Sequence, residues 1–281
     1  MREKKLVTKH LLKTCLILLV LILSGCEEKQ VKKERNDFKK YYDQFQVDGS
    51  FILFDENNNF TIFYNKEQLK QQFSPASTFK ILNSLIGLET GVIKDEEFII
   101  PWDSIVRNPV WDKDHDLKSA FSNSVVWYYQ ELARRVGEEK MIFWINKANY
   151  GNKDISGSID SFWLTGGLLI SPEQQLEFLR RLHANSLPFS KRSTDIVKKI
   201  MVVKDTLDYK ISAKTGWGGH GSKDIGWYIG YVEVKSKVYF FVNCVQSESD
   251  KLNDVENAKR FDQARKEIVY LILNDLDIIK D

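Results

Sequence analysis

The sequence of 281 residues predicts an α+β fold in which strands from both ends of the chain form one sheet. Strand-like apolar runs occur at 49–54, 59–64, 209–213, 225–234 and from residue 238 onward. The stretch between the second and third runs has a mostly helical pattern. Sequence-distant strands on either side of a helical block indicate a sheet with a helical insertion, and they argue against a doubly wound sheet.

Local signals mark the helix boundaries. Ser74 can cap the first long helix, Pro75 suits its first position and Gly91 can end it. Further helices are predicted at 125–136, 138–146 and 172–183, and a closing helix at about 254–276. The chain is 43% hydrophobic, which allows a sizeable core.

The formal net charge of +2 hides an uneven distribution. Residues 1–25 carry a local charge of +4, so the remainder of the chain is near −2. A chain without basic segments in its body lacks the charge pattern of nucleic-acid binding. We therefore expect no nucleic-acid partner.

The N-terminus has the features of an export signal. A basic stretch precedes an apolar run from Cys15 to Leu23, which is too short to span a bilayer comfortably. The run ends in Leu23-Ser24-Gly25-Cys26, which resembles a bacterial lipobox, where the cysteine is lipidated and becomes the new N-terminus. An uncleaved anchor and an ordinary signal peptide are the alternatives.

This pattern divides the chain into three parts. We expect a lipoprotein signal peptide at 1–25, a charged tether at 26–37 and the folded domain at 38–281. The mature protein would be exported and anchored in a membrane by lipid on Cys26, facing the periplasm or the cell exterior.

Cys244 would be the one cysteine left after processing, because Cys15 leaves with the signal and Cys26 carries lipid. We therefore expect no intramolecular disulfide, and we expect Cys244 to be a core residue because it lies in an apolar run. The four histidines show no metal-ligand spacing, and no phosphate loop or dinucleotide fingerprint occurs. Neither a metal nor an organic cofactor is predicted.

The segment Ser77-Thr78-Phe79-Lys80 is the first candidate for chemistry. Ser77 falls in the first turn of the helix that Pro75 begins, and Lys80 lies three residues on, on the same face. The helix N-terminus favours developing negative charge. A serine hydroxyl needs an adjacent base, and a lysine with a lowered pKa or a chemical modification can be that base. Taken alone, the pattern also fits a surface serine and lysine.

Three other short segments have both a chemical and a structural interpretation. Ser124-Val125-Val126 could place a hydroxyl in a site, or Ser124 could simply cap a helix. A lysine, a hydroxyl and a glycine at the end of an apolar strand, Lys214-Thr215-Gly216, can bind a carboxylate and leave room for a substrate, or can be an ordinary strand end. Tyr150-Gly151-Asn152 is by itself a turn.

In this order, these segments resemble the motif set of the class D, oxacillinase-type serine β-lactamases, together with Phe162-Trp163-Leu164. The resemblance extends from about Gly49 to the closing helix. It implies a β-lactamase/transpeptidase-like fold, with a central antiparallel sheet flanked by helices and a mostly helical insertion. It also implies hydrolysis of the β-lactam ring of penicillin-type antibiotics through a serine acyl-enzyme, which confers antibiotic resistance.

The resemblance also implies a role for each residue of the reaction centre. Ser77 would attack the lactam carbonyl, and Lys80, N-carboxylated by carbon dioxide, would be the general base. Ser124 would relay a proton. The apolar pocket around the carbamate would comprise Phe79, Val126, Leu164 and Trp163, with the Trp163 N–H as a hydrogen-bond donor.

Binding of the substrate is assigned on the same basis. The backbone N–H groups of Ser77 and Trp217 would form the oxyanion hole. Lys214, Thr215 and Gly216 would face the substrate carboxylate. Arg265 resembles the carboxylate-binding arginine of the family, although Arg260 is near and stays an alternative. Homodimers occur in the family, so a homodimer is left open.

Val126 favours a hydrolase over a cell-wall transpeptidase. Carboxylation needs a neutral amine, and apolar surroundings lower the pKa of a lysine. By resemblance, penicillin-binding transpeptidases usually carry asparagine at this place. The second alternative is a β-lactam sensor whose acyl-enzyme persists. Such sensors normally have several membrane spans and a zinc protease motif, and this sequence shows neither.

Overall fold

The computed structural model describes residues 31–280. The predicted signal peptide and the lipidation site at Cys26 lie outside these residues. Among the helices of the described part, none is both long and apolar enough to cross a membrane. Of the predicted tether, residues Val31–Glu34 form strand β1, and Arg35 pairs with Asp275 at 2.8 Å, so residues 32–35 belong to the folded domain.

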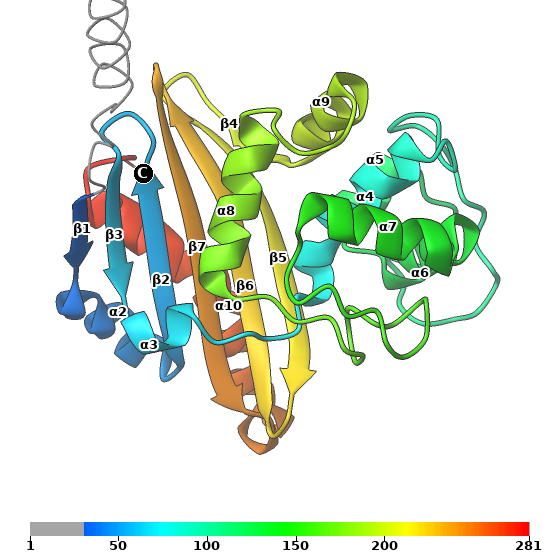
Figure 1. The fold of residues 1–281 in the computed structure, drawn as a ribbon. Coiled ribbons are helices and arrows are strands. Elements are labelled where there is room, and N and C mark those ends of the chain that lie inside the picture. Colours follow the sequence, from blue (N-terminus) through cyan, green and yellow to red (C-terminus); the bar gives the residue numbers. More distant parts are fainter. Residues whose placement is uncertain (1–30, 281) are drawn as a thin grey trace, which may run out of the picture. The chain divides into compact units, whose positions relative to one another are not determined.

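Seven strands within residues 31–280 form one sheet in the order β1-β3-β2-β7-β6-β5-β4 (Figure 1). After β1, the strands in sequence order are β2 (Asp48–Asp55), β3 (Phe60–Tyr64), β4 (Val202–Asp205), β5 (Lys210–His220), β6 (Lys223–Val234) and β7 (Lys237–Glu248). The pairings from β3 across to β4 are antiparallel. Ile52 of β2 lies opposite Val242 of β7, which joins the two ends of the sequence and confirms the predicted α+β sheet.

Helices cover both faces of this sheet (Figure 1). The helices α2 (Lys39–Phe45) and α10 (Val255–Asp275) pack on one face, and α8 (Pro172–His183) packs on the other. Successive side chains of a strand point to opposite faces. In β6, Ile229 therefore packs in the core on the α8 side, whereas Tyr228 and Val232 pack toward α10. Cys244 of β7 is buried in the core, as predicted for an apolar strand.

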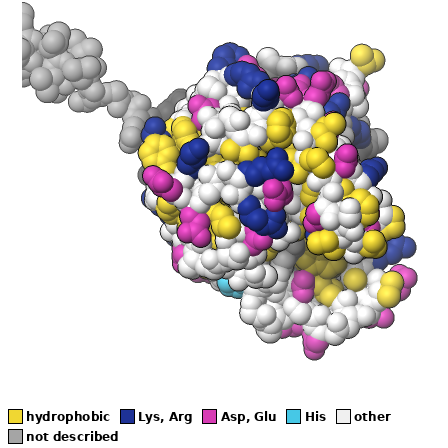
Figure 2. Space-filling model, turned by 90° about the vertical axis from the view of Figure 1, so that its right-hand side faces the viewer, with side chains coloured by type: hydrophobic (Ala, Val, Ile, Leu, Met, Phe, Trp, Pro, Cys, Tyr) yellow, Lys and Arg dark blue, Asp and Glu magenta, His cyan; other side chains and the backbone are white. Residues whose placement is uncertain are grey.

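A helical region lies beside β5 (Figure 1). This region comprises α4 (Lys80–Glu89), α5 (Leu117–Ser122), α6 (Val126–Val136), α7 (Glu138–Ala148) and α9 (Lys191–Ile200). The short helix α3 (Lys66–Leu69) instead packs against β2 and α8. Residues 80–88 of α4 are all buried, so α4 is the centre of this region. On the outer face of the region, basic and acidic side chains are interspersed (Figure 2).

The structure differs from the sequence prediction at two places that matter for the site. Helix α4 does not begin at Pro75 but follows a 3₁₀ turn, η2 (Ala76–Phe79). The Ala76 N–H bonds Trp163 O at 3.0 Å, and Ser74 Oγ donates to the same oxygen at 2.9 Å, so a neighbouring loop takes the polar groups that would start an α-helix. Strand β5 extends past residue 213 to His220, because it pairs with β6 throughout.

Candidate functional site

The Ser-x-x-Lys motif lies where η2 leads into α4. Side chains three residues apart are eclipsed in a 3₁₀ helix, which sets Ser77 against Lys80. Lys80 Nζ donates a hydrogen bond to Ser77 Oγ at 2.6 Å. The turn itself is held from α8, because Gln175 Nε2 donates to Thr78 Oγ1 at 2.8 Å and Thr78 Oγ1 donates to Pro75 O at 2.7 Å. The two candidate residues are therefore in direct contact.

The Lys80 side chain is buried, with 1% of the residue exposed. This burial lowers the pKa of its amine well below the ordinary value, and the positive charge of Lys214 lowers the pKa further. Within residues 31–280, Nζ bonds two hydroxyl oxygens, Ser77 Oγ and Ser124 Oγ at 3.3 Å, and no carboxylate. A lysine in such surroundings favours the neutral amine, which can accept a proton.

Aromatic side chains lie next to the Ser-x-x-Lys motif. Phe79 stacks on Trp163 with ring centroids 5.4 Å apart, and the Tyr129 ring lies 5.4 Å from Lys80 Nζ. Val126 and Leu164 are half-buried. The Trp163 indole N–H bonds none of the other described residues, so this donor remains available.

The Tyr-Gly-Asn segment holds the loop that carries Trp163. Gly151 has a φ of +56°, and a Cβ there would lie 2.2 Å from Leu169 O, so the position requires glycine. Asn152 Oδ1 accepts a hydrogen bond from the Leu169 N–H at 3.0 Å, and Nδ2 donates to Gly167 O at 2.8 Å. The segment is a turn, as its sequence indicated, and its place in the site is structural.

Ser124 does not cap a helix. The N-cap of α6 is Val125, which makes no side-chain cap, and Ser124 adopts a left-handed backbone with a φ of +54°. This conformation is uncommon for a residue other than glycine, and it often marks a functional position. Ser124 Oγ accepts hydrogen bonds from Lys80 Nζ at 3.3 Å and from Lys214 Nζ at 3.0 Å. The hydroxyl therefore bridges two lysines that are distant in sequence.

Lys214 is the second buried lysine of the site, with 5% of the residue exposed. Burial lowers the pKa of its amine to about 7, with smaller contributions from the positive charges of Arg265 and Lys266. Its Nζ also donates to Thr215 O at 3.1 Å. Lys214 can therefore exist as an ammonium or as an amine near neutral pH.

Within residues 31–280, no strand pairs with the edge of β5 beside η2. Strand β4 reaches only to Ser212 on this edge, and the Ala213 N–H bonds Met201 O at 2.8 Å. Because N–H groups alternate in direction along an antiparallel strand, the Trp217 N–H faces the same edge as that of Ala213. A Cβ on Gly216 would lie 3.1 Å from Pro75 O, so glycine lets the strand approach the turn closely.

The Ser77 N–H points to no acceptor among the described residues. Two backbone donors, from Ser77 and Trp217, are thus available in the space between η2 and β5. Such a pair of donors can stabilise a developing oxyanion.

Arg265 of α10 reaches the same strand from the opposite face. Its Nη1 donates to Gly216 O at 3.1 Å, and its guanidinium lies 5.3 Å from the Trp217 ring. The residue is 8% exposed, and burial lowers its pKa to about 10. Arg260, the alternative that the sequence left open, instead bonds Gln46. Arg265 is therefore the arginine that lies beside the Lys-Thr-Gly strand.

Three side chains that the sequence did not single out support this arrangement: Gln175, Asp224 and Asp262. Trp217 Nε1 donates to Asp224 Oδ1 at 2.6 Å, and Asp262 pairs with Arg265. The spacing of three residues on a predicted helix was a signal for the pair of Asp262 and Arg265. Gln175 contacts a residue 97 positions away, and no local pattern indicates this.

The comparisons with known proteins agree on one family. The model "Penicillin binding protein transpeptidase domain" matches residues 28–269. The β-lactamase OXA-48 of Klebsiella pneumoniae is 42% identical over 222 residues, which are 78% of this chain and 84% of that protein. The probable β-lactamase YbxI of Bacillus subtilis is 40% identical over 215 residues, 76% of this chain and 80% of that protein. The crystal structure of a class D β-lactamase from Sebaldella termitidis has a TM-score of 0.84 at 36% identity, and the match covers 90% of this chain and 100% of that chain.

Proposed function

Because the chain belongs to the class D β-lactamases and is a serine hydrolase of β-lactam antibiotics that confers resistance, we propose that Ser77 is its nucleophile and Lys80 its general base. The observation that carries this assignment is the 2.6 Å contact between Lys80 Nζ and Ser77 Oγ in a buried pocket. The family model that matches the chain is named for penicillin-binding transpeptidases, but the named relatives and the solved structures are β-lactamases, so hydrolysis is the supported activity.

Lys80 acts as an N-carboxylated side chain in this proposal. A neutral amine attacks carbon dioxide and loses one proton, which yields a carbamate with a negative charge. The burial of Lys80 supports this step, because it lowers the pKa of the amine and so increases the neutral fraction. The free indole N–H of Trp163 suits a carbamate oxygen, and Phe79, Val126 and Leu164 exclude water around it.

Hydrolysis then takes place in two steps. Lys80 takes the proton of Ser77 Oγ as that oxygen bonds the lactam carbonyl carbon. When the C–N bond of the ring breaks, the ring nitrogen receives a proton through Ser124, whose Oγ lies between Lys80 and Lys214. In the second step, the carbamate of Lys80 takes a proton from the water that attacks the ester carbonyl, and it returns this proton to Ser77 Oγ as the ester C–O bond breaks.

The β5 edge binds the substrate. The N–H groups of Ser77 and Trp217 hold the carbonyl oxygen, whose negative charge grows in the transition state. The substrate carboxylate lies against Lys214, Thr215 and Arg265, and Gly216 leaves room for the substrate beside the strand. Charge-assisted hydrogen bonds of this kind are roughly twice as strong as neutral ones.

We also propose that the protein is an exported lipoprotein, anchored by lipid on Cys26 after removal of residues 1–25. The support is the order of basic stretch, apolar run and lipobox-like residues. Replacement of Cys26 with serine should move the protein from the membrane fraction to the soluble fraction. An unchanged membrane fraction would mean that another segment anchors the chain.

The catalytic assignment is tested with a chromogenic cephalosporin. We expect repeated turnover that rises with added bicarbonate, whereas a single stoichiometric burst would contradict the proposed base. Ser77→Ala should abolish covalent labelling by a fluorescent penicillin, and Ser186→Ala, at an exposed serine, should label as the parent does. Labelling that persists in a folded Ser77→Ala variant would mean that another residue is the nucleophile.

A further inference from the structure

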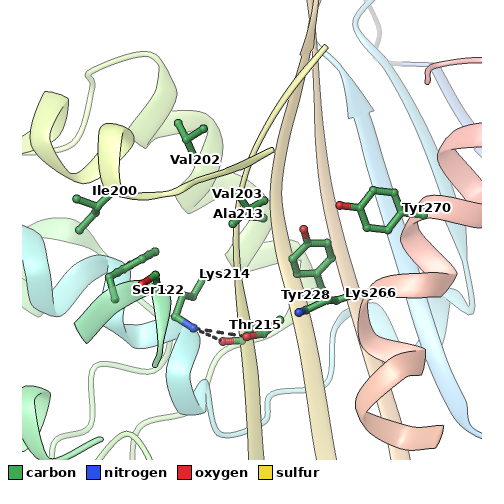
Figure 3. A pocket seen from close by; sticks show the side chains of 11 residues that line it. Ser122, Ile200, Val202, Val203, Ala213, Lys214, Thr215, Tyr228, Lys266 and Tyr270 are labelled. Atoms are coloured by element: carbon green, nitrogen blue, oxygen red, sulfur yellow. Dashed lines mark hydrogen bonds between the residues drawn. The ribbon is translucent and has the colours of Figure 1, made fainter. Parts of the chain in front are cut away.

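A hollow of about 400 Å³ adjoins the outer side of the Lys-Thr-Gly strand. Side chains of the helical region line it on one side of β5, and side chains of β6 and α10 line it on the other (Figure 3). Its lining comprises Phe121, Ser122, Ile200, Val202, Val203, Ala213, Lys214, Thr215, Tyr228, Lys266 and Tyr270. Of the residues assigned to the reaction, it shares only Lys214 and Thr215, so most of the hollow lies outside the site of hydrolysis.

The charge of this hollow is positive. Lys214 and Lys266 line it, and none of its lining residues is acidic. Lys266 is exposed and forms no ion pair with another residue of 31–280. Lys214 and Lys266 line the same hollow, and the positive charges of Arg265 and Lys266 both lower the pKa of Lys214. An anion in the hollow would relieve this repulsion.

The remaining lining combines hydroxyl groups with aliphatic side chains. Tyr228 is largely buried, and this burial raises the pKa of its hydroxyl, so the group is a neutral hydrogen-bond donor. Among the aliphatic side chains of the lining, Val203 is 54% exposed, and Val202 and Ile200 line the hollow with it (Figure 3). Exposed aliphatic residues that border a polar hollow are typical of a ligand site.

We propose that this hollow is a second binding site, which takes a small aliphatic carboxylate. The carboxylate group would lie between Lys266 and Lys214 and accept a hydrogen bond from Tyr228 or Tyr270. The hydrocarbon chain would lie against the aliphatic side chains of α9 and β4. A volume of about 400 Å³ suits a molecule of this size.

Such a ligand would slow turnover through Lys214. An anion beside this lysine favours the ammonium and draws it away from Ser124, whose Oγ is 3.0 Å from Lys214 Nζ and 3.3 Å from Lys80 Nζ. This effect on turnover rests on the roles proposed above for Ser124 and Lys214, whereas binding in the hollow does not.

The test uses hexanoate, with uncharged hexanamide as the control probe, at constant ionic strength. Binding to the protein is measured by saturation-transfer NMR, and inhibition is measured as initial rates of cephalosporin hydrolysis over a range of substrate concentrations. We expect hexanoate, but not hexanamide, to bind and to lower kcat at saturating substrate. Lys266→Ala should weaken both effects about tenfold, each measured relative to the uninhibited rate of the same variant, since the loss of one charge-assisted hydrogen bond is worth about a factor of ten or more.

Two control variants make the outcome decisive. Lys259→Ala removes another exposed lysine of α10 that does not line the hollow, and it should respond to hexanoate as the parent does. Val203→Asp places a negative charge at the rim, and it should abolish binding. Purely competitive inhibition that Lys266→Ala leaves unchanged would place the carboxylate in the substrate site and overturn the proposal. Binding that depends on Lys266 without any loss of kcat would overturn its link to turnover, while the assignment of Ser77 and Lys80 would stand.

Discussion

Replacement of Val126 with asparagine should make the enzyme strongly dependent on bicarbonate. Val126 begins α6 and follows Ser124 by two residues, and Ser124 Oγ lies 3.3 Å from Lys80 Nζ. Asparagine is close to valine in size, but its amide attracts water into the pocket. With less desolvation, the pKa of the Lys80 amine rises and the ammonium, which does not react with carbon dioxide, becomes more populated.

The magnitude follows from the cause of the lowered pKa. Desolvation is the larger of the two effects that lower the pKa of Lys80 from 10.5, and the charge of Lys214 is the smaller. Each unit by which the pKa rises above the working pH reduces the neutral fraction about tenfold, or about 1.4 kcal/mol. A loss of desolvation that raises the pKa to one unit above the working pH therefore lowers turnover about tenfold at ambient carbon dioxide and raises the half-saturating bicarbonate concentration by about the same factor.

The assay is a bicarbonate titration of initial rates for the parent and Val126→Asn at neutral pH. Val255→Asn is the matched control, because Val255 also begins a helix, α10, but is 78% exposed and should leave the titration unchanged. Carbon-13 NMR with labelled bicarbonate reports the carbamate directly. If Val126→Asn is folded and has the same half-saturating bicarbonate concentration as the parent, the claim that Val126 excludes water from the Lys80 amine is wrong.

Two further predictions concern the β5 edge. Lys214→Met should abolish efficient hydrolysis yet raise the melting temperature at acidic pH, because the folded pKa of Lys214 is about 7 against 10.5 for the ordinary side chain. The penalty of burying the ammonium is fully present below pH 7 and fades as the pH rises toward 10.5. The stabilisation of Lys214→Met over the parent, on the order of a few kcal/mol, should therefore shrink in thermal melts at high pH. An equal gain in melting temperature at every pH would contradict the assigned pKa. Gly226→Ala should raise KM about tenfold with little change in kcat, since a Cβ there would lie 2.7 Å from Arg265 Cγ and displace a charge-assisted contact to the substrate. Gly219→Ala, where a Cβ meets nothing within 4 Å, is its control, and an equal KM for both variants would remove Arg265 from the binding of the carboxylate.

The elements that the sequence predicted best are those with local signals. The helix at 172–183 was predicted with the bounds that the structure shows. Pro172 occupies its first position, and Ser171 and Gln174 form a capping box at its N-terminus. By contrast, the strand at 209–213 was predicted too short. The glycine-rich continuation to His220 has low strand propensity, and only its pairing with β6 keeps it extended. The short helices α2, α5 and α9 were not predicted, because tertiary packing stabilises them.

The candidate site also combines a contact that the sequence predicts with one that it does not. The contact of Ser77 with Lys80 could be predicted, because a spacing of three residues fixes it in either kind of helical turn. The bridge from Ser124 to Lys214 spans 90 residues and depends on the left-handed backbone of Ser124, so no spacing rule reaches it. The resemblance to a family named both residues, but the structure was needed to bring them together.

The candidate site lowers the stability of the fold, because it buries two lysine side chains. Lys80 and Lys214 bond no carboxylate of the described residues, and burial of two unpaired ammonium groups would destabilise the protein by several kcal/mol each. The fold lowers this cost when one or both amines lose their protons, and the neutral amine is the reactive form. Ser124 supplies the one hydroxyl that both amines share, which accounts for its strained backbone. The edge of β5 beside them is open among the described residues, so the features that weaken the fold at this point are those that the proposed mechanism uses.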